Sequence, residues 1–173
     1  MSMETVKKIN YLKIYKSFLI ALIGTIFLAI SAKIKIPFYP VPMTMQTFVV
    51  LVIAVGFGWR LGVCTVALYL FEGIIGLPVF SGTPEKGIGI VYFTGTTMGY
   101  LIGFIVTVFI AGRFNYNNNI ITNFLKLSFA TSFIYLFGLF WLGSLIGWDK
   151  PIFKLGAEPF LLAELFKMLL LLF

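Results

Sequence analysis

The chain consists of long uninterrupted runs of apolar residues that are separated by short polar or proline-rich stretches. The six runs cover residues 17–32, 44–58, 61–77, 90–112, 124–148 and 159–173. A hydrocarbon core of about 30 Å takes an apolar helix of about 20 residues, so each run predicts a membrane span, the shorter ones with tilt or local bilayer thinning. The runs are continuous and lack the alternation that lipid-facing strands require.

The pattern therefore predicts an all-α integral membrane protein, a bundle of six transmembrane helices in a single membrane domain over residues 1–173. Residues 1–16 are expected to be a cytoplasmic or interfacial amino terminus, and residues 17–173 the bundle. Three prolines within 37–42 block a regular helix after the first span. The glycine-rich stretch 78–89 is expected to be a re-entrant or lid-like loop between spans three and four, because glycine lets a backbone approach a ligand closely.

Composition supports the bilayer over the cytosol and excludes several classes of function. Charged residues make up 11% of the chain and hydrophobic residues 60%, whereas soluble domains are about a quarter charged. The net charge of +7 is better explained by residues that flank spans and face anionic lipid than by nucleic-acid binding. One cysteine and no histidine exclude an internal disulfide, a His-based metal site and a Ser-His-Asp triad. We therefore expect a protein that is not an enzyme and that uses no metal or cofactor. No G-x-x-x-x-G-K-[ST] loop is present, so another subunit would have to hydrolyse ATP for any uphill transport.

The distribution of basic residues predicts an orientation with both termini in the cytoplasm. The inner side then carries Lys7, Lys8, Lys13, Lys16, Arg60, Arg113 and Lys126. The outer loops carry Lys33, Lys35, Lys86, Lys150 and Lys154. The bias of seven against five has the sign that the positive-inside rule requires.

Ionisable residues inside predicted spans are the candidate functional groups, because they are costly in a bilayer and commonly face a cavity or a partner. Glu164 and Lys167 lie three residues apart in span six and share a helix face, so they form either a self-neutralising ion pair or a site for an anionic ligand. Glu72 in span three is either a carboxylate hydrogen-bonded near a helix end or a ligand contact. Lys86 in the glycine-rich loop is either an exposed charge or a ligand contact.

Four sequence motifs, spread in order over residues 17–173, resemble the BioY family of biotin-binding components of energy-coupling-factor (ECF) transporters. Residues 36–47 contain P-V-P-M-T-M-Q-T, and residues 76–82 read G-L-P-V-F-S-G. Residues 84–104 contain P-E-K-G-I-G followed by T-G-T-T-M-G-Y-L-I-G-F, similar to the family's G-P-T-G-G-Y-L-x-G-F. Residues 159–167 read P-F-L-L-A-E-L-F-K, similar to P-F-x-x-G-D-x-x-K.

The resemblance implies biotin uptake through a site near the outer surface, between the loop after span three and the start of span six. Lys167 would meet the valerate carboxylate, Glu164 would stand where the family has Asp, Lys86 would match a basic loop position, and Glu72 would lie near a ureido contact. Two departures bear on the ligand: Thr96 replaces a family proline, and Ala163-Glu164 replaces Gly-Asp. A binding component for another small carboxylic acid vitamin and a stand-alone facilitator remain alternatives.

The resemblance also implies partners and a location. The partners are a transmembrane coupling subunit and two ATP-binding-cassette ATPases, and the location is a bacterial-type plasma membrane. Ala21, Thr25 and Ala29 in span one form a small-residue face at four-residue spacing, which we expect to dock the coupling subunit. Gly99 and Gly103 offer a similar face in span four.

Overall fold

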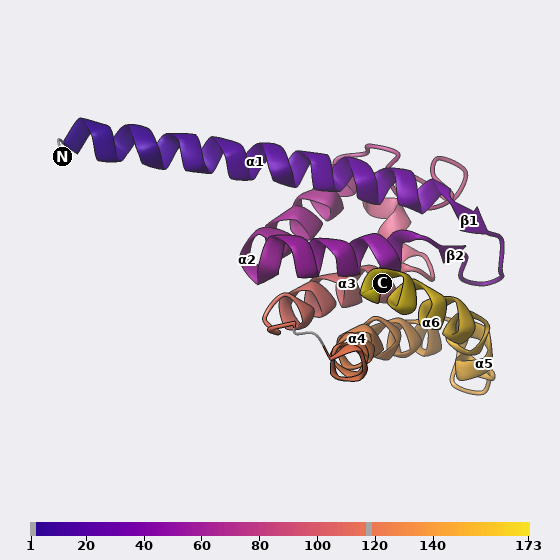
Figure 1. The fold of residues 1–173 in the computed structure, drawn as a ribbon. Coiled ribbons are helices and arrows are strands. Elements are labelled where there is room, and N and C mark those ends of the chain that lie inside the picture. The colour runs from indigo at the N-terminus through magenta and orange to yellow at the C-terminus, as the bar shows by residue number, and fades with distance from the viewer. Residues whose placement is uncertain (1–2, 117–118) are drawn as a thin grey trace.

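The computed structural model describes the backbone of residues 3–116 and 119–173 and the side chains of residues 11–116 and 119–173. The expected helical bundle is confirmed (Figure 1). Its elements are α1 (Met3–Lys33), β1 (Lys35–Ile36), β2 (Met43–Thr44), α2 (Gln46–Ile74), the 3₁₀ helix η1 (Gly89–Thr94), α3 (Met98–Ala111), α4 (Ile120–Ile146), α5 (Ile152–Gly156) and α6 (Glu158–Leu172). The two short strands pair antiparallel, with Lys35 opposite Thr44.

Helix α2 is folded back on itself and supplies two of the six spans. Gly58 has φ +71° and ψ 173°, which interrupts the helix beside the connector expected at residues 59–60. The Gln46 amide donates a hydrogen bond to the Tyr69 hydroxyl at 2.7 Å. In a straight helix these residues would lie about 35 Å apart, so the two arms of α2 run antiparallel and side by side.

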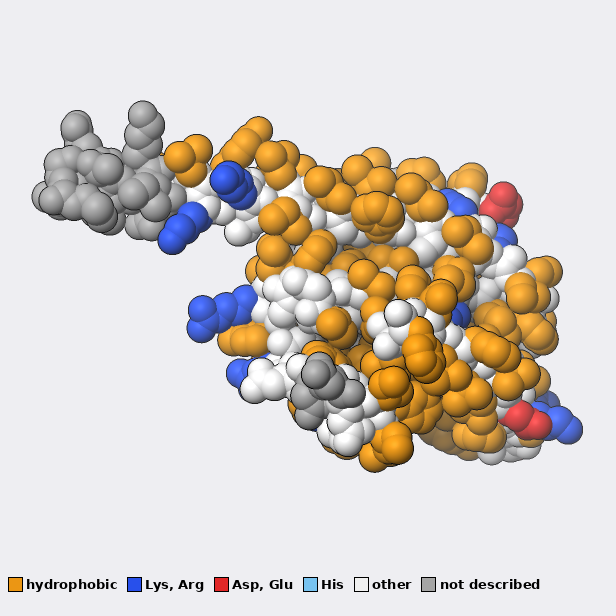
Figure 2. All heavy atoms as spheres, in the orientation of Figure 1, with side chains coloured by type: hydrophobic (Ala, Val, Ile, Leu, Met, Phe, Trp, Pro, Cys, Tyr) orange, Lys and Arg blue, Asp and Glu red, His pale blue; other side chains and the backbone are white. Residues whose placement is uncertain are grey.

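The surface of the bundle is largely apolar, as a bilayer requires. By length and composition, three described helices are long and apolar enough to cross a membrane: Tyr11–Lys33, Gln46–Ile74 and Ile120–Ile146. The second of these is divided into two arms at Gly58. The apolar helix α3 is shorter. In Figure 2 hydrophobic side chains cover the flank of the molecule, and the charged side chains gather toward its ends.

Two expected boundaries differ from those in the structure. Helix α1 already begins at Met3, so most of residues 1–16, expected to be a cytoplasmic or interfacial amino terminus, is continuous with the first helix, and this part of α1 extends beyond the bundle (Figure 1). The fourth span begins at Met98 rather than at residue 90, because residues 89–94 form η1 and Gly95 is extended. Apolar content alone does not distinguish a short 3₁₀ helix from the start of a long α-helix.

The small-residue face of α1 packs inside the chain, which corrects the expected docking face. Ala21 and Thr25 are buried, and Ala29 is partly buried against the core. The Thr25 hydroxyl lies 2.9 Å from a Glu72 carboxylate oxygen, which accepts its hydrogen bond from across the contact with α2. These small side chains do let another helix approach closely, but that helix is α2 of the same chain.

The expected close approach at Gly99 and Gly103 is confirmed, because both glycines of α3 lie against the backbone of α4. A Cβ atom on Gly103 would lie 2.6 Å from the Ile134 Cα and 3.0 Å from the Phe133 carbonyl oxygen. Backbone atoms cannot avoid this contact by changing rotamer, as a side chain could. A Cβ atom at Gly103 would therefore force α3 and α4 apart.

We therefore expect Gly103→Ala to destabilise the protein by about 1–3 kcal/mol through overpacking, which lowers the Tm of the detergent-solubilised protein by roughly 2–12 °C. Gly56→Ala is the matched control, because a Cβ atom there meets nothing within 4 Å. The control variant should match or slightly exceed the wild-type Tm. Equal melting temperatures for the two variants would contradict the close helix contact.

Candidate functional site

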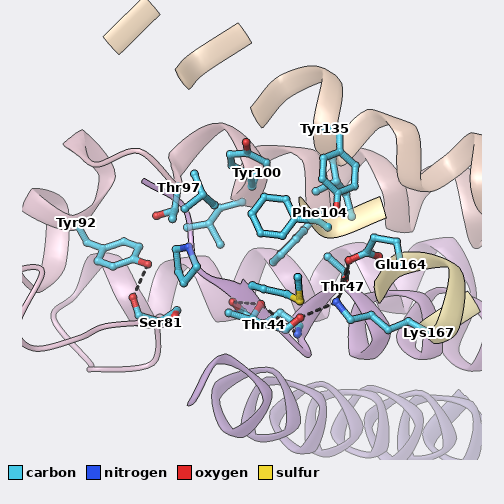
Figure 3. A pocket seen from close by; sticks show the side chains of 17 residues that line it. Thr44, Thr47, Ser81, Tyr92, Thr97, Tyr100, Phe104, Tyr135, Glu164 and Lys167 are labelled. Carbon is cyan, nitrogen blue, oxygen red and sulfur yellow. Dashed lines mark hydrogen bonds and ion pairs between the residues drawn. The ribbon is translucent and has the colours of Figure 1, made fainter. Parts of the chain in front are cut away.

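A cavity of about 50 Å³ lies at the end of the bundle where the β1–β2 hairpin, the segment between α2 and α3, and the start of α6 meet (Figure 3). This volume holds only a few water molecules. Its lining combines one acid, one base, several hydroxyl groups and a majority of apolar or aromatic side chains. The lining residues are Val41, Pro42, Met43, Thr44, Gln46, Thr47, Ser81, Tyr92, Thr97, Tyr100, Leu101, Phe104, Ile134, Tyr135, Phe160, Glu164 and Lys167.

The Lys167 ammonium is buried and uses all three of its N–H donors within the chain. It donates to the Thr44 carbonyl at 2.7 Å, to the Thr47 hydroxyl at 2.8 Å and to Glu164 Oε1 at 2.8 Å. The Lys167 and Glu164 side chains are only 7% and 5% exposed, so water contributes little to their solvation. An incoming anion would therefore have to replace one of these three acceptors.

The two oxygens of the Glu164 carboxylate have different roles. Oε1 accepts from Lys167 and from the Thr47 hydroxyl, the latter at 2.7 Å. Oε2 is buried and accepts no well-formed hydrogen bond within the described part of the chain. The Tyr135 hydroxyl points toward this carboxylate (Figure 3). A buried, unsatisfied acceptor is costly, so Oε2 is a ready partner for a ligand N–H.

Among the described residues that line the cavity, only Glu164 and Lys167 are charged, and their opposite charges balance. Most of the remaining lining is aromatic or aliphatic. Phe160 stacks on Tyr135 with the ring centroids 6.3 Å apart, and Tyr135 meets Tyr100 edge-on at 6.2 Å. The Tyr100 hydroxyl is satisfied by the Gly156 carbonyl at 2.8 Å, which leaves its ring face as an apolar surface. The arrangement suits a small ligand with one polar end and an apolar body.

Local sequence explains why these groups converge. Pro159 near the amino end of α6 starts the helix with a residue whose missing N–H costs nothing there, and the three-residue spacing puts Glu164 and Lys167 on one face. The proline-rich segment before α2 reverses the chain, so that Thr44 and Thr47 face α6. The Thr96 hydroxyl donates to the Pro40 carbonyl at 3.0 Å and so ties this hairpin to the segment before α3.

The loop between the α2 and α3 helices forms one wall of the cavity and is anchored at several points. Phe80 is 1% exposed, fits against Gly73 and stacks on Tyr92 at 4.7 Å. The Tyr92 hydroxyl donates to the Ser81 carbonyl at 2.8 Å, and burial raises the pKa of this phenol, so it stays protonated as a donor. The Tyr69 hydroxyl, which receives the Gln46 amide bond, donates in turn to the Val79 carbonyl at 3.0 Å.

Lys33 at the end of α1 forms hydrogen bonds to the same loop. Its ammonium donates to the Phe80 carbonyl at 3.0 Å, to the Thr83 carbonyl at 3.1 Å and to the Thr83 hydroxyl at 2.9 Å. The loop is thus held between the first helix and the cavity wall.

The structure brings together two of the four predicted ligand contacts. Glu164 and Lys167 form an ion pair in the cavity wall. This geometry is compatible with both interpretations of the pair, a self-neutralising ion pair and a site for an anionic ligand. Lys86 is exposed in the loop, with its stem against Gly82, and does not line the cavity. Glu72 also lies outside the lining, in the α1–α2 contact with Thr25, which agrees with its reading as a structural carboxylate.

Sequence reasoning missed Thr47, Gln46 and Tyr135 as cavity residues. Thr47 and Gln46 belong to the P-V-P-M-T-M-Q-T motif, which could have pointed to them. Hydrophobic periodicity alone does not show that these two side chains face a cavity. Tyr135 is one aromatic residue among many in an apolar run, and only the packing of α4 singles it out.

Comparisons with known proteins agree with this architecture. The family model described as the BioY family matches residues 3–173. The chain is 34% identical to the probable biotin transporter BioY of Pyrococcus horikoshii, over 80% of this chain and 81% of that protein. It is also 34% identical to the biotin transporter BioY of Thermotoga maritima, over 84% and 85% of the two chains.

A solved structure shares the fold. It is the crystal structure of the S-component for biotin from an ECF-type ABC transporter, which superposes with a TM-score of 0.77 at 24% identity over 92% of this chain and 88% of that chain. Sequence similarity and structural similarity thus support the same family assignment, and the family model extends over nearly the whole chain. The chain belongs to the BioY family.

Proposed function

We propose that this protein binds biotin in the cavity beside α6 and serves as the substrate-binding component of a biotin uptake system. The observation that carries the proposal is the buried Glu164–Lys167 pair in the wall of an otherwise apolar and aromatic cavity. Relatives at 34% identity over most of their length are named biotin transporters, which supports the ligand and a transport role rather than an enzymatic one.

Each part of biotin finds a matching group in the cavity. The valerate carboxylate replaces one of the three acceptors of Lys167 and keeps a charge-assisted hydrogen bond. The ureido ring offers N–H donors, and Glu164 Oε2 is a buried acceptor that receives no well-formed hydrogen bond from the described residues. The apolar sulfur ring lies against the aromatic wall around Tyr100 and Phe160. Glu164 keeps the carboxylate of the family's Asp on a side chain one methylene longer.

Biotin is larger than a few water molecules, so the cavity wall has to move for the ligand to enter. We assign this movement to the loop over residues 78–89, which contributes Ser81 to the lining and is held by Lys33. Lys86 is exposed on this loop, and it becomes a ligand contact only if the loop rearranges.

The arrangement of charges supports an orientation with the cavity outside and both termini in the cytoplasm. Arg60 and Arg113 lie together at the end of the bundle opposite the cavity, as the positive-inside assignment requires. The membrane is then a bacterial-type plasma membrane. An ECF coupling subunit and two ABC ATPases supply the energy, since this sequence carries no P-loop motif. Because Ala21 and Thr25 are buried, the coupling subunit meets the exposed side of α1, which carries Ile26 and Phe27.

The Lys167→Ala variant tests the ligand assignment directly. Isothermal calorimetry on detergent-purified protein should show tight biotin binding by the wild type and no binding of lipoate. Loss of the charge-assisted contact should weaken biotin binding by about 1.5–3 kcal/mol, or roughly 10- to 150-fold. The exposed Lys150→Ala variant is the control and should bind like the wild type. A folded, monodisperse wild-type sample that does not bind biotin would overturn the assignment.

Thr47 should set the position of both charged groups, since its hydroxyl bonds to Lys167 and Glu164 at once. Thr47→Val keeps the shape but leaves each partner short of one hydrogen bond, so we expect about 10- to 100-fold weaker biotin binding. Thr47→Ser should restore most of the affinity. Thr131→Val, which removes a buried hydroxyl that has no hydrogen-bond partner among the described residues, should leave the affinity unchanged. Equal Kd values for Thr47→Val and the wild type would show that the hydroxyl does not position the site.

The Lys33→Met variant tests the loop as a lid. Removing the ammonium frees the Phe80 and Thr83 carbonyl groups, so the loop should open more often and labelled biotin should dissociate several-fold faster in a chase experiment. Lys35→Met, a neighbouring exposed lysine on β1, is the control. Identical dissociation rates for all three proteins would assign the movement to another wall of the cavity.

A further inference from the structure

The end of the bundle opposite the cavity carries a pre-organised basic and aromatic cluster, formed by Trp59, Arg60 and Arg113 and named here the Trp59 cluster. Trp59 and Arg60 follow the Gly58 turn within α2, and Arg113 follows α3. The Trp59 N–H donates to the Gly112 carbonyl at 3.1 Å. A Cβ atom on Gly112 would lie 2.5 Å from the Trp59 nitrogen, so the two connectors touch along their backbones and their relative position is fixed.

Both guanidinium groups are stacked on aromatic rings. The Arg60 and Arg113 Cζ atoms lie 5.2 and 4.8 Å from the Trp59 ring centroid, and Arg113 also lies 4.3 Å from the centroid of Phe109. Trp59 and Phe109 themselves meet edge-on at 5.7 Å. Cation–π contacts hold the guanidinium planes but use none of their N–H donors, which therefore remain directed to the surroundings. The two groups lie at most about 10 Å apart, because both lie within about 5 Å of one ring.

No carboxylate of the described part of the chain neutralises this cluster. The ion pairs among described residues are Lys150–Asp149 and Lys167–Glu164, both toward the cavity end. The remaining described acids also belong to that half: Glu72 and Glu85 lie near the loop after α2, and Glu158 begins α6. Two adjacent arginines without an acidic partner repel one another, and a bound anion removes that cost.

We propose that the Trp59 cluster binds the phosphate group of an anionic phospholipid. Guanidinium groups bind phosphate oxygens through paired N–H donors, and tryptophan at a span end lies at the level of the lipid headgroups. The neighbouring surface is suited to acyl chains, because Val55 and Phe109 are partly exposed apolar side chains on the adjoining helices. This site is separate from the cavity and does not depend on the identity of the transported ligand.

Lipid binding to the full-length, delipidated protein in a non-ionic detergent tests the proposal. Titration with dioleoyl-phosphatidylglycerol should show saturable binding, measured by native mass spectrometry or by Trp fluorescence. Dioleoyl-phosphatidylcholine, which has the same chains but no net charge, should bind at least several-fold more weakly. R60Q/R113Q should weaken phosphatidylglycerol binding about tenfold, since each exposed charge-assisted contact contributes a factor of roughly three. K150Q/K154Q removes the same charge at the other end of the molecule and should leave binding unchanged.

Three results would overturn the proposal. They are equal affinity for the two lipids, an equal loss of binding in both double variants, and displacement of the lipid by millimolar inorganic phosphate. The last would identify a site for a free anion rather than for a lipid headgroup. A monodisperse size-exclusion profile and a Tm close to that of the wild type report whether each variant is folded. If R60Q/R113Q fails that check, the single variants R60Q and R113Q, each expected to weaken lipid binding about threefold, replace it in the comparison.

Discussion

The burial of one ammonium group in a membrane bundle constrains much of this structure. An ion without partners in such a place would cost several kcal/mol, so Lys167 has to find three acceptors at once. Glu164 from the same helix supplies one, and the junction between β2 and α2 supplies the other two through Thr44 and Thr47. The end of the first connector, the start of α2 and the face of α6 are thereby fixed relative to one another.

The same constraint makes the site usable by a ligand. Each bond of Lys167 is satisfied, yet each is replaceable by a ligand oxygen of similar chemistry, so the exchange costs little beyond the displaced acceptor. Glu164 Oε1 accepts from Lys167 and from Thr47, whereas Oε2 accepts no well-formed hydrogen bond within the described residues and lies on the side of the carboxylate near Tyr135. The cavity therefore has a polar end with a fixed direction and an aromatic remainder. That combination selects a small ligand with an acid group, hydrogen-bond donors and an apolar body.

Glycine allows the helices to come close enough for this geometry. Gly99 and Gly103 bring α3 against the α4 backbone, Gly73 accommodates the Phe80 ring, and Gly112 meets the Trp59 connector. Between helices in a bilayer there is no hydrophobic driving force, so such close contacts and a few buried hydrogen bonds carry the association. At one end they shape the cavity beside α6, and at the other they hold two arginines on one indole ring.

The sequence by itself determined the membrane class, the six apolar runs, the break near residues 58–60 and the shared face of Glu164 and Lys167, because these follow from hydropathy, proline and glycine positions, and helical period. It did not determine which elements those faces meet. Thus Ala21 and Thr25 turned inward toward α2, Glu72 paired with Thr25 away from the cavity, and Lys86 lay exposed on its loop. Thr47 and Tyr135 joined the site through contacts across 117 and 29 positions of the chain, and only tertiary packing decides which distant residues share a cavity.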